Sequence, residues 1–342
     1  MRAVLLISTG PIADSFLPLL SEKALVERYR LITFRQRRLA SSTNGAAPVS
    51  FAEHAADAAA LLGHLDVRRT HVAGHSTGAA IALQLAVDRP DIVQTLALFE
   101  PPLVGAPSAG AFFEKAGPAL AAYGSGDRDG AMAGFLSVVC SLDWETCRKV
   151  IEKHVPGGVA QAMTNENVDN FFASYLPALT AWQFGADQAA SISRPVLSVL
   201  GMETDQLFVD SHELLHSWFP QVEDCRIEGV AHLLHMQRPE PVARGVAEFF
   251  ARHPMTGGDI HDGRSTLAFS SNVAMSLKMS LTASVFLARR VGESPRSSWT
   301  KSSYPQRLCL LSSDLTFARW NRILRRRRRI ETFRNVARPT QT

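Results

Sequence analysis

Short runs of apolar residues alternate with longer amphipathic segments along the first 253 residues. Runs of four to six mostly apolar residues predict buried strands, whereas the longer segments have the spacing of helices with one apolar face. Strands that alternate with helices favour a mainly parallel sheet with helices on both faces, so we predict an α/β fold. The strands are expected at 4–7, 30–34, 70–73, 95–99, 195–200 and 224–227, and the helices at 51–65, 79–88, 211–218 and 239–251.

The alternation of predicted strands and helices stops between residues 103 and 193. This part predicts helices only, at 112–123, 128–141, 144–154 and 167–184. A helical insertion after a strand is typical of a cap laid over a site at the strand ends. We therefore predict a core in two parts, residues 1–102 and 194–253, with a helical cap formed by residues 103–193.

The segment 254–342 differs from the rest in composition. It holds 16 Lys and Arg against 5 Asp and Glu, a charge of +11, whereas residues 1–253 carry −7. It contains 13 serines and the arginine run Arg325–Arg329 but no sustained periodicity, which indicates a disordered tail. The arginine run could contact nucleic acid nonspecifically through phosphates. An altered reading frame is the alternative explanation of this segment.

Composition argues against a membrane-spanning, disulfide-rich or secreted protein. Apolar residues form 46% of the 342 residues, and no run approaches the length of a membrane span. Four scattered cysteines do not form a disulfide framework, and the apolar run after Met1 is too short for a signal peptide. We expect a cytoplasmic protein that acts on a small molecule; the oligomeric state is left open.

The motif with the most chemical content is Gly74-His75-Ser76-Thr77-Gly78, a G-x-S-x-G sequence. The predicted strand 70–73 precedes it and an alanine-rich helix follows it. In that context the motif predicts a sharp turn that exposes the serine hydroxyl at the start of a helix. Ser76 is therefore the candidate nucleophile.

A serine nucleophile needs a histidine base, and the histidine needs a carboxylate to orient it. His232 follows a predicted strand and the turn Gly229-Val230-Ala231. The segment 229–240, which ends in Pro239-Glu240, closely resembles the histidine loop of the α/β-hydrolase family. Together with the serine motif, it makes residues 3–252 resemble that family.

The resemblance leaves two carboxylates as candidates for the acid. Asp205 follows the strand after which the family usually carries the acid, although the usual position falls on Thr204. Glu100 follows the strand after the serine helix, a position that some relatives use. We favour Asp205 and keep Glu100 as the alternative.

The resemblance also implies two backbone N–H donors for an oxyanion. One is Thr77, directly after the nucleophile. The other lies in the loop after the first strand, where relatives carry His-Gly-x-x and this chain has Ser8-Thr9-Gly10-Pro11. Gly10 is the expected donor, because Pro11 has no N–H. The loop that begins at Arg37 has an arginine where the family has glycine.

With a serine at position 76, the chain resembles the serine-nucleophile branch of the family. That resemblance implies cleavage of an ester-like acyl bond of a small, largely apolar substrate without a cofactor. The family usually has two antiparallel strands before the strand predicted at 4–7, and these are expected to be absent here. A non-catalytic binding protein with the same fold is the alternative, because the oxyanion loop is atypical.

A second motif competes with the first. His212-Glu213-Leu214-Leu215-His216 matches H-E-x-x-H, which on a helix places two zinc ligands one turn apart beside a glutamate base. The candidates for a third ligand, Glu223, Glu228 and Glu240, lie in no recognisable partner motif. We keep a zinc peptidase as a weak alternative and predict no metal for the main function.

Overall fold

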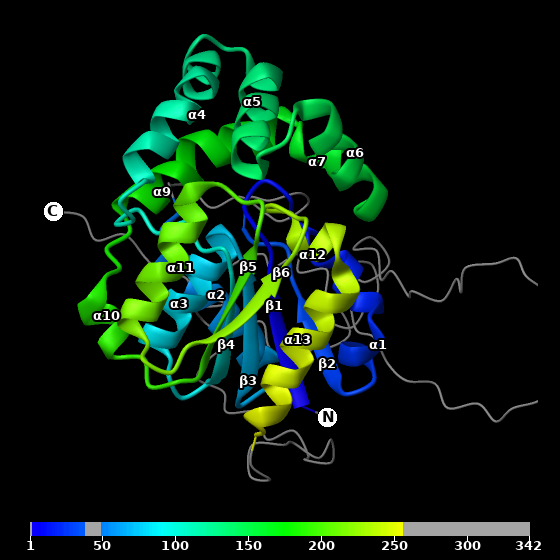
Figure 1. The fold of residues 1–342 in the computed structure, drawn as a ribbon, viewed down its shortest axis with the longest axis vertical. Helices are drawn as coiled ribbons and strands as arrows, with labels where there is room; N and C mark the ends of the chain where they lie inside the picture. The colour runs from blue at the N-terminus through cyan, green and yellow to red at the C-terminus, as the bar shows by residue number, and fades with distance from the viewer. Residues whose placement is uncertain (1, 38–48, 256–342) are drawn as a thin grey trace, which may run out of the picture. The chain divides into compact units, whose positions relative to one another are not determined.

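The computed structural model describes residues 2–37 and 49–255, which form a parallel sheet of six strands with helices on both faces (Figure 1). The strand order is β2-β1-β3-β4-β5-β6. This confirms the predicted fold class. The strands are β1 (Arg2–Ile7), β2 (Tyr29–Thr33), β3 (Thr70–His75), β4 (Val93–Phe99), β5 (Val196–Gly201) and β6 (Glu223–Ile227).

Alternating side chains of each central strand enter two hydrophobic clusters. In β1, Leu5 and Ile7 pack on one face, whereas Val4 and Leu6 pack on the other. Because both faces are covered, the central strands are largely continuous apolar runs, which is why the sequence predicts their positions closely. The first face is covered by α2 (Phe51–His64), α3 (Thr77–Asp88) and α11 (Gln206–Trp218), and the second by η1 (Leu17–Ser21), α1 (Lys23–Val26), α12 (Leu234–Gln237) and α13 (Pro239–Arg252).

Only helices occur in the described chain between β4 and β5, and most of them lie beyond one end of the sheet (Figure 1). The segment predicted as one helix over 167–184 is divided into three pieces, one of which is a π-helical turn, and two short helices were not predicted. The elements are α4 (Ala109–Gly124), α5 (Arg128–Cys140), α6 (Trp144–His154), α7 (Gly158–Ala162), α8 (Asn165–Asn170), η2 (Phe171–Tyr175), α9 (Leu176–Ala181) and α10 (Ala186–Ala190).

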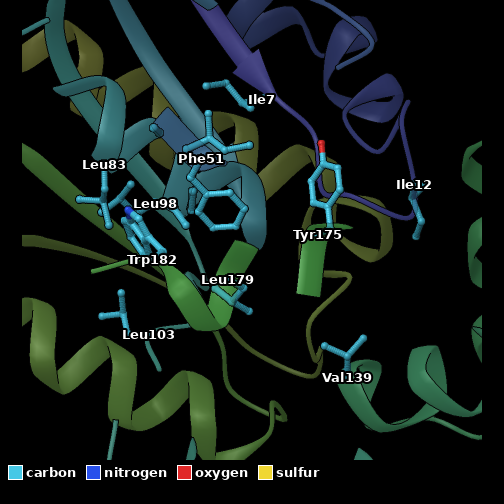
Figure 2. Close-up of a cluster of buried hydrophobic side chains, with 14 of the residues drawn as sticks. Ile7, Ile12, Phe51, Leu83, Leu98, Leu103, Val139, Tyr175, Leu179 and Trp182 are labelled. Carbon is cyan, nitrogen blue, oxygen red and sulfur yellow. The ribbon is translucent and has the colours of Figure 1, made fainter. Parts of the chain in front are cut away.

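Aromatic side chains join this helical segment to the sheet. The ring of Trp182 lies 5.6 Å from that of Phe51 on α2, and its indole N–H donates to Gln84 on α3 at 2.8 Å. Figure 2 shows Phe51, Trp182 and Leu179 in one cluster with Ile7 from the sheet and Leu103 from the chain after β4. The helical segment is thus packed on the sheet layer through a continuous apolar core.

The predicted tail lies outside the described residues from residue 256 onward, as does residue 38 in the loop that begins at Arg37. Among the described residues, none of the helices combines the length and the apolar character that crossing a bilayer requires.

Candidate functional site

Ser76 lies in the sharp turn between β3 and α3. Its φ of 55° and ψ of −123° are values that a residue with a side chain rarely adopts. The Ser76 N–H donates to the carbonyl of Phe99 at 2.8 Å, which ties the turn to the end of β4. The serine is 6% exposed and forms part of a cavity wall.

The two glycines of the motif are required by close packing. A Cβ at Gly74 would lie 2.3 Å from the carbonyl oxygen of Gly78. A Cβ at Gly78 would lie 2.1 Å from the carbonyl oxygen of Ile7. The G-x-S-x-G spacing therefore allows α3 to approach both β3 and the end of β1.

His232 lies in the loop between β6 and α12 and lines the same cavity as Ser76. Its ring stacks on Phe208 of α11, with the centroids 4.1 Å apart and the planes at 17°. Its carbonyl accepts a 2.9 Å hydrogen bond from Nε2 of His75, the residue before Ser76. Stacking and this backbone contact hold the His232 loop against the serine turn.

The carboxylate that contacts His232 is Glu100. Its Oε2 lies 2.7 Å from Nδ1 of His232. The same carboxyl group accepts hydrogen bonds from the N–H of Gly201 at 2.8 Å and the hydroxyl of Thr204 at 2.9 Å. Glu100 is 1% exposed and has a φ of 47°, which turns the chain sharply after β4.

Asp205, the carboxylate favoured from the sequence, is not brought to His232. Its Oδ1 accepts from the N–H of Leu207 and thus caps α11, and its Oδ2 lies 2.7 Å from Nζ of Lys115. Capping explains why α11 begins at Gln206, five residues earlier than predicted. The neighbouring Thr204, at the usual position of the family acid, instead hydrogen-bonds Glu100.

Burial changes the protonation of this pair. Burial raises the pKa of Glu100 to about 8, and the hydrogen bonds from Gly201 and Thr204 oppose that shift. Burial lowers the pKa of His232 to about 3. The imidazole is therefore neutral at pH 7. When Glu100 is ionised, the neutral ring donates from Nδ1 and keeps Nε2 as a proton acceptor.

The expected oxyanion donors meet at the start of α3. Thr77 is the first residue of that helix, where a backbone N–H has no partner within the helix. The N–H of Gly10 donates to Oγ1 of Thr77 at 2.9 Å. The structure thus brings Gly10 and Thr77 together, with the Gly10 N–H bound to the threonine hydroxyl.

Two residues from the helical segment hold the Gly10 loop, and the sequence analysis did not identify either. The ring of Tyr175 lies against Gly10, since a Cβ there would come within 2.8 Å of it. Its hydroxyl donates to Gln36, whose amide donates to the carbonyl of Ser8 at 2.7 Å. Asn167 donates to the carbonyl of Pro11 at 3.2 Å. Sequence separations above 130 residues explain why no local signal indicated these contacts.

The cavity beside Ser76 is strongly apolar. It contains about 660 Å³ of empty space, its opening to solvent included. Residues of the sheet and its covering helices form one part of the wall, and residues of the helical segment between β4 and β5 form the other. Its polar residues include Thr9, Ser76, Thr77 and His232, and its apolar residues include Phe112, Phe135, Phe171, Leu176, Leu207 and Phe208.

The H-E-x-x-H motif lies elsewhere, on α11. His212 and His216 are absent from the wall of the Ser76 cavity and face Asp224 of β6. Glu223, one of the third ligands considered from the sequence, instead contacts Arg252 and His253. The structure therefore separates the two competing motifs in space.

Comparison with solved structures supports the same fold. A thermophilic esterase from Thermogutta terrifontis is 20% identical, with a TM-score of 0.61 over 74% of this chain and 91% of that one. An enol-lactonase from Burkholderia xenovorans LB400 is 16% identical, with a TM-score of 0.59 over 73% and 91%. Est816, described as an N-acyl homoserine lactone degrading enzyme, is 23% identical, with a TM-score of 0.54 over 73% and 93%. At these identities the similarity is one of fold.

No curated protein matches the sequence significantly. A family model described as alpha/beta hydrolase fold matches residues 7–239, a range that includes Ser76, Glu100 and His232. The match covers more than half of the chain and agrees with the sheet order and the serine turn. The chain belongs to the alpha/beta hydrolase family.

Proposed function

We propose that this protein is a serine hydrolase that cleaves an ester-like acyl bond of a small, largely apolar substrate through an acyl-enzyme. The observation that carries the proposal is the pairing of His232 with buried Glu100 at 2.7 Å, beside a strained Ser76 on the same cavity wall. Three residues distant in sequence supply a nucleophile, a base and an orienting acid.

In the proposed reaction, Oγ of Ser76 attacks the acyl carbonyl and Nε2 of His232 takes the proton. Glu100 holds the ring through Nδ1 and stabilises the positive charge that forms on it. His232 then returns the proton to the leaving alcohol, and water attacks the acyl-serine by the same route. No metal or cofactor is assigned a step.

The oxyanion of the tetrahedral intermediate is assigned to the N–H groups of Thr77 and Gly10. The Gly10 N–H leaves Oγ1 of Thr77, 2.9 Å away, and turns to the oxyanion. Tyr175 and Asn167 contact the Gly10 loop and thereby position this donor.

The cavity suits a substrate with an apolar acyl or alcohol group, because phenylalanine and leucine side chains form much of its wall. Structural neighbours named as an esterase and as lactonases are consistent with ester or lactone bonds. We therefore propose uncharged esters or lactones with short to medium alkyl chains as the substrate class.

A panel of p-nitrophenyl esters of increasing chain length tests the proposal. The wild-type chain should show a burst of p-nitrophenol followed by turnover, and Ser76→Ala and His232→Ala should abolish both. His64→Ala, an exposed histidine at the end of α2, is the matched control and should keep full activity.

A non-catalytic binding protein is the second candidate, because the Gly10 N–H donates to Oγ1 of Thr77. It predicts that the esters bind in the cavity without burst or turnover at any chain length. That result would contradict the hydrolase proposal.

A further inference from the structure

Three side chains that can bind a metal converge at the β6 edge of the sheet, outside the wall of the Ser76 cavity. His212 and His216 lie one turn apart on α11, and Asp224 lies on the edge strand β6. Nε2 of His216 is 2.8 Å and Nε2 of His212 is 3.8 Å from the same Asp224 oxygen, Oδ1. One possible ligand atom from each residue lies within 4.8 Å of the others.

The sheet register explains this convergence. Asp224 of β6 pairs with Ser198 of β5, so both side chains lie on one face of the sheet. Nδ1 of His212 lies 2.8 Å from the hydroxyl of Ser198. The serine therefore holds the His212 ring on the face where Asp224 also emerges.

The hydrogen bonds also indicate the tautomer of His212. A guanidinium N–H of Arg226 points at Nε2 of His212 from 3.3 Å, and arginine can only donate. Nε2 therefore carries a lone pair, and the Nδ1 proton is donated to Ser198. A neutral imidazole with one nitrogen fixed by a hydrogen bond and a lone pair on the other is the form that ligates a metal.

The donor set and the spacing fit a borderline transition metal. Two imidazole nitrogens and one carboxylate oxygen bind Zn²⁺ at about 2.0–2.2 Å, which places tetrahedral ligands about 3.3 Å apart. Small movements of the exposed His216 and Asp224 side chains reach that spacing. Arg226 is half-exposed and can leave the site.

We propose that His212, His216 and Asp224 form a structural binding site for a divalent transition metal, with Zn²⁺ as the expected ion and water completing its coordination. The ion joins α11 to β6. The helix carries Phe208, which stacks on His232, and the strand leads into the His232 loop. The site therefore stabilises the framework of the catalytic histidine without entering the Ser76 cavity.

Zinc binding to the full, chelator-treated chain tests this proposal by calorimetry and thermal unfolding. We expect one Zn²⁺ per chain at this site and a higher unfolding midpoint. His216→Ala and Asp224→Asn should each weaken binding at least tenfold, because each removes one of three protein ligands. His64→Ala and Glu213→Ala should leave binding unchanged, and Arg226→Ala should strengthen it or leave it unchanged.

Co²⁺ supplies a second readout, since its visible absorption reports low-symmetry coordination directly. The bands of a four-coordinate ion should appear in the wild-type chain and be lost in His216→Ala. Zinc affinity equal in the wild type, His216→Ala and Asp224→Asn would overturn the proposal, as would the absence of binding to the wild type.

Ester hydrolysis separates this proposal from the proposed function. Activity should persist in His216→Ala, and zinc binding should persist in Ser76→Ala. Peptide cleavage that requires both zinc and Glu213 would identify a zinc peptidase and would contradict a purely structural role.

Discussion

Nδ1 of His232 lies 2.7 Å from Oε2 of Glu100, and both side chains are almost completely buried. The contact joins the end of β4 to the loop after β6, which are 132 residues apart in the sequence. Gly201 at the end of β5 and Thr204 in the turn that follows complete the hydrogen bonds of the carboxylate. The strand order β4-β5-β6 brings these three segments together.

The choice of acid leads to the first prediction. Glu100→Gln should lower kcat/KM by a factor on the order of 10⁴, because the amide cannot stabilise the imidazolium and favours the wrong tautomer. Asp205→Asn should change kcat/KM only a few-fold, since Asp205 caps α11 and contacts Lys115. Steady-state kinetics on one ester compares the two variants, and the reverse order of effects would restore Asp205 as the acid.

The pH dependence of kcat/KM should report the same pair. Burial raises the pKa of Glu100 to about 8, so protonation as the pH falls through this value removes the carboxylate that orients His232. Activity should therefore rise with pH through about 8, with the titration belonging to the pair. If kcat/KM instead rises at or below pH 6.5, the ordinary pKa of histidine, Glu100 stays ionised throughout the pH range.

His54 should make the fold sensitive to acid. It is 1% exposed with neither ring nitrogen hydrogen-bonded, and burial, aided by Arg37, lowers its pKa to about 3. The folded-state pKa lies below the unfolded value, so its contribution to stability is present above pH 6.5 and is lost as the pH falls toward 3. In that window each pH unit costs about 1.4 kcal/mol.

Urea unfolding of His54→Phe at several pH values measures this contribution. The variant should lose less stability than the wild type between pH 6.5 and 4, while the wild type retains the steeper slope. Parallel curves for the two proteins would mean that His54 does not titrate on unfolding.

The close approach of α3 to β1 predicts a severe effect of a single methyl group. Gly78→Ala would place Cβ 2.1 Å from the Ile7 carbonyl oxygen, so we expect destabilisation of at least about 3 kcal/mol or failure to fold. Gly63→Ala in α2 is the control, because nothing lies within 4 Å of its Cβ. It should stabilise by about 0.5–1 kcal/mol. Thermal unfolding that is equal for both variants would contradict the packing argument.

Tyr175 should act on the oxyanion loop. Tyr175→Phe keeps the ring against Gly10 but removes the hydroxyl that donates to Gln36, which in turn holds the Ser8 carbonyl. We expect kcat to fall about tenfold with little change in KM, because the loop serves the transition state. A change confined to KM would instead indicate a role in substrate binding.

Much of the core was predictable because its signals are local. The central strands are largely apolar, and the turn at Ser76 is marked by two glycines with a strand before and a helix after. The His232 loop has a recognisable sequence of its own. These features depend on neighbours within about ten residues.

The rest depends on contacts between distant segments. Glu100 and Asp205 both follow strands, and only the three-dimensional arrangement distinguishes the partner of His232 from the cap of α11. Asp224 joins His212 and His216 because of sheet register, which the helical motif does not contain. The division of the predicted helix 167–184 includes a π-helical turn at η2, for which the periodicity gave no sign.

The central claim is that Ser76 is an activated nucleophile. Incubation with a small alkyl fluorophosphonate, followed by intact-mass and peptide mass spectrometry, tests it most directly. We expect one adduct per chain, located on Ser76, with labelling lost in Ser76→Ala and strongly slowed in His232→Ala and Glu100→Gln. An unlabelled wild-type chain, or an adduct on a different residue that forms equally well in Ser76→Ala, would contradict the account.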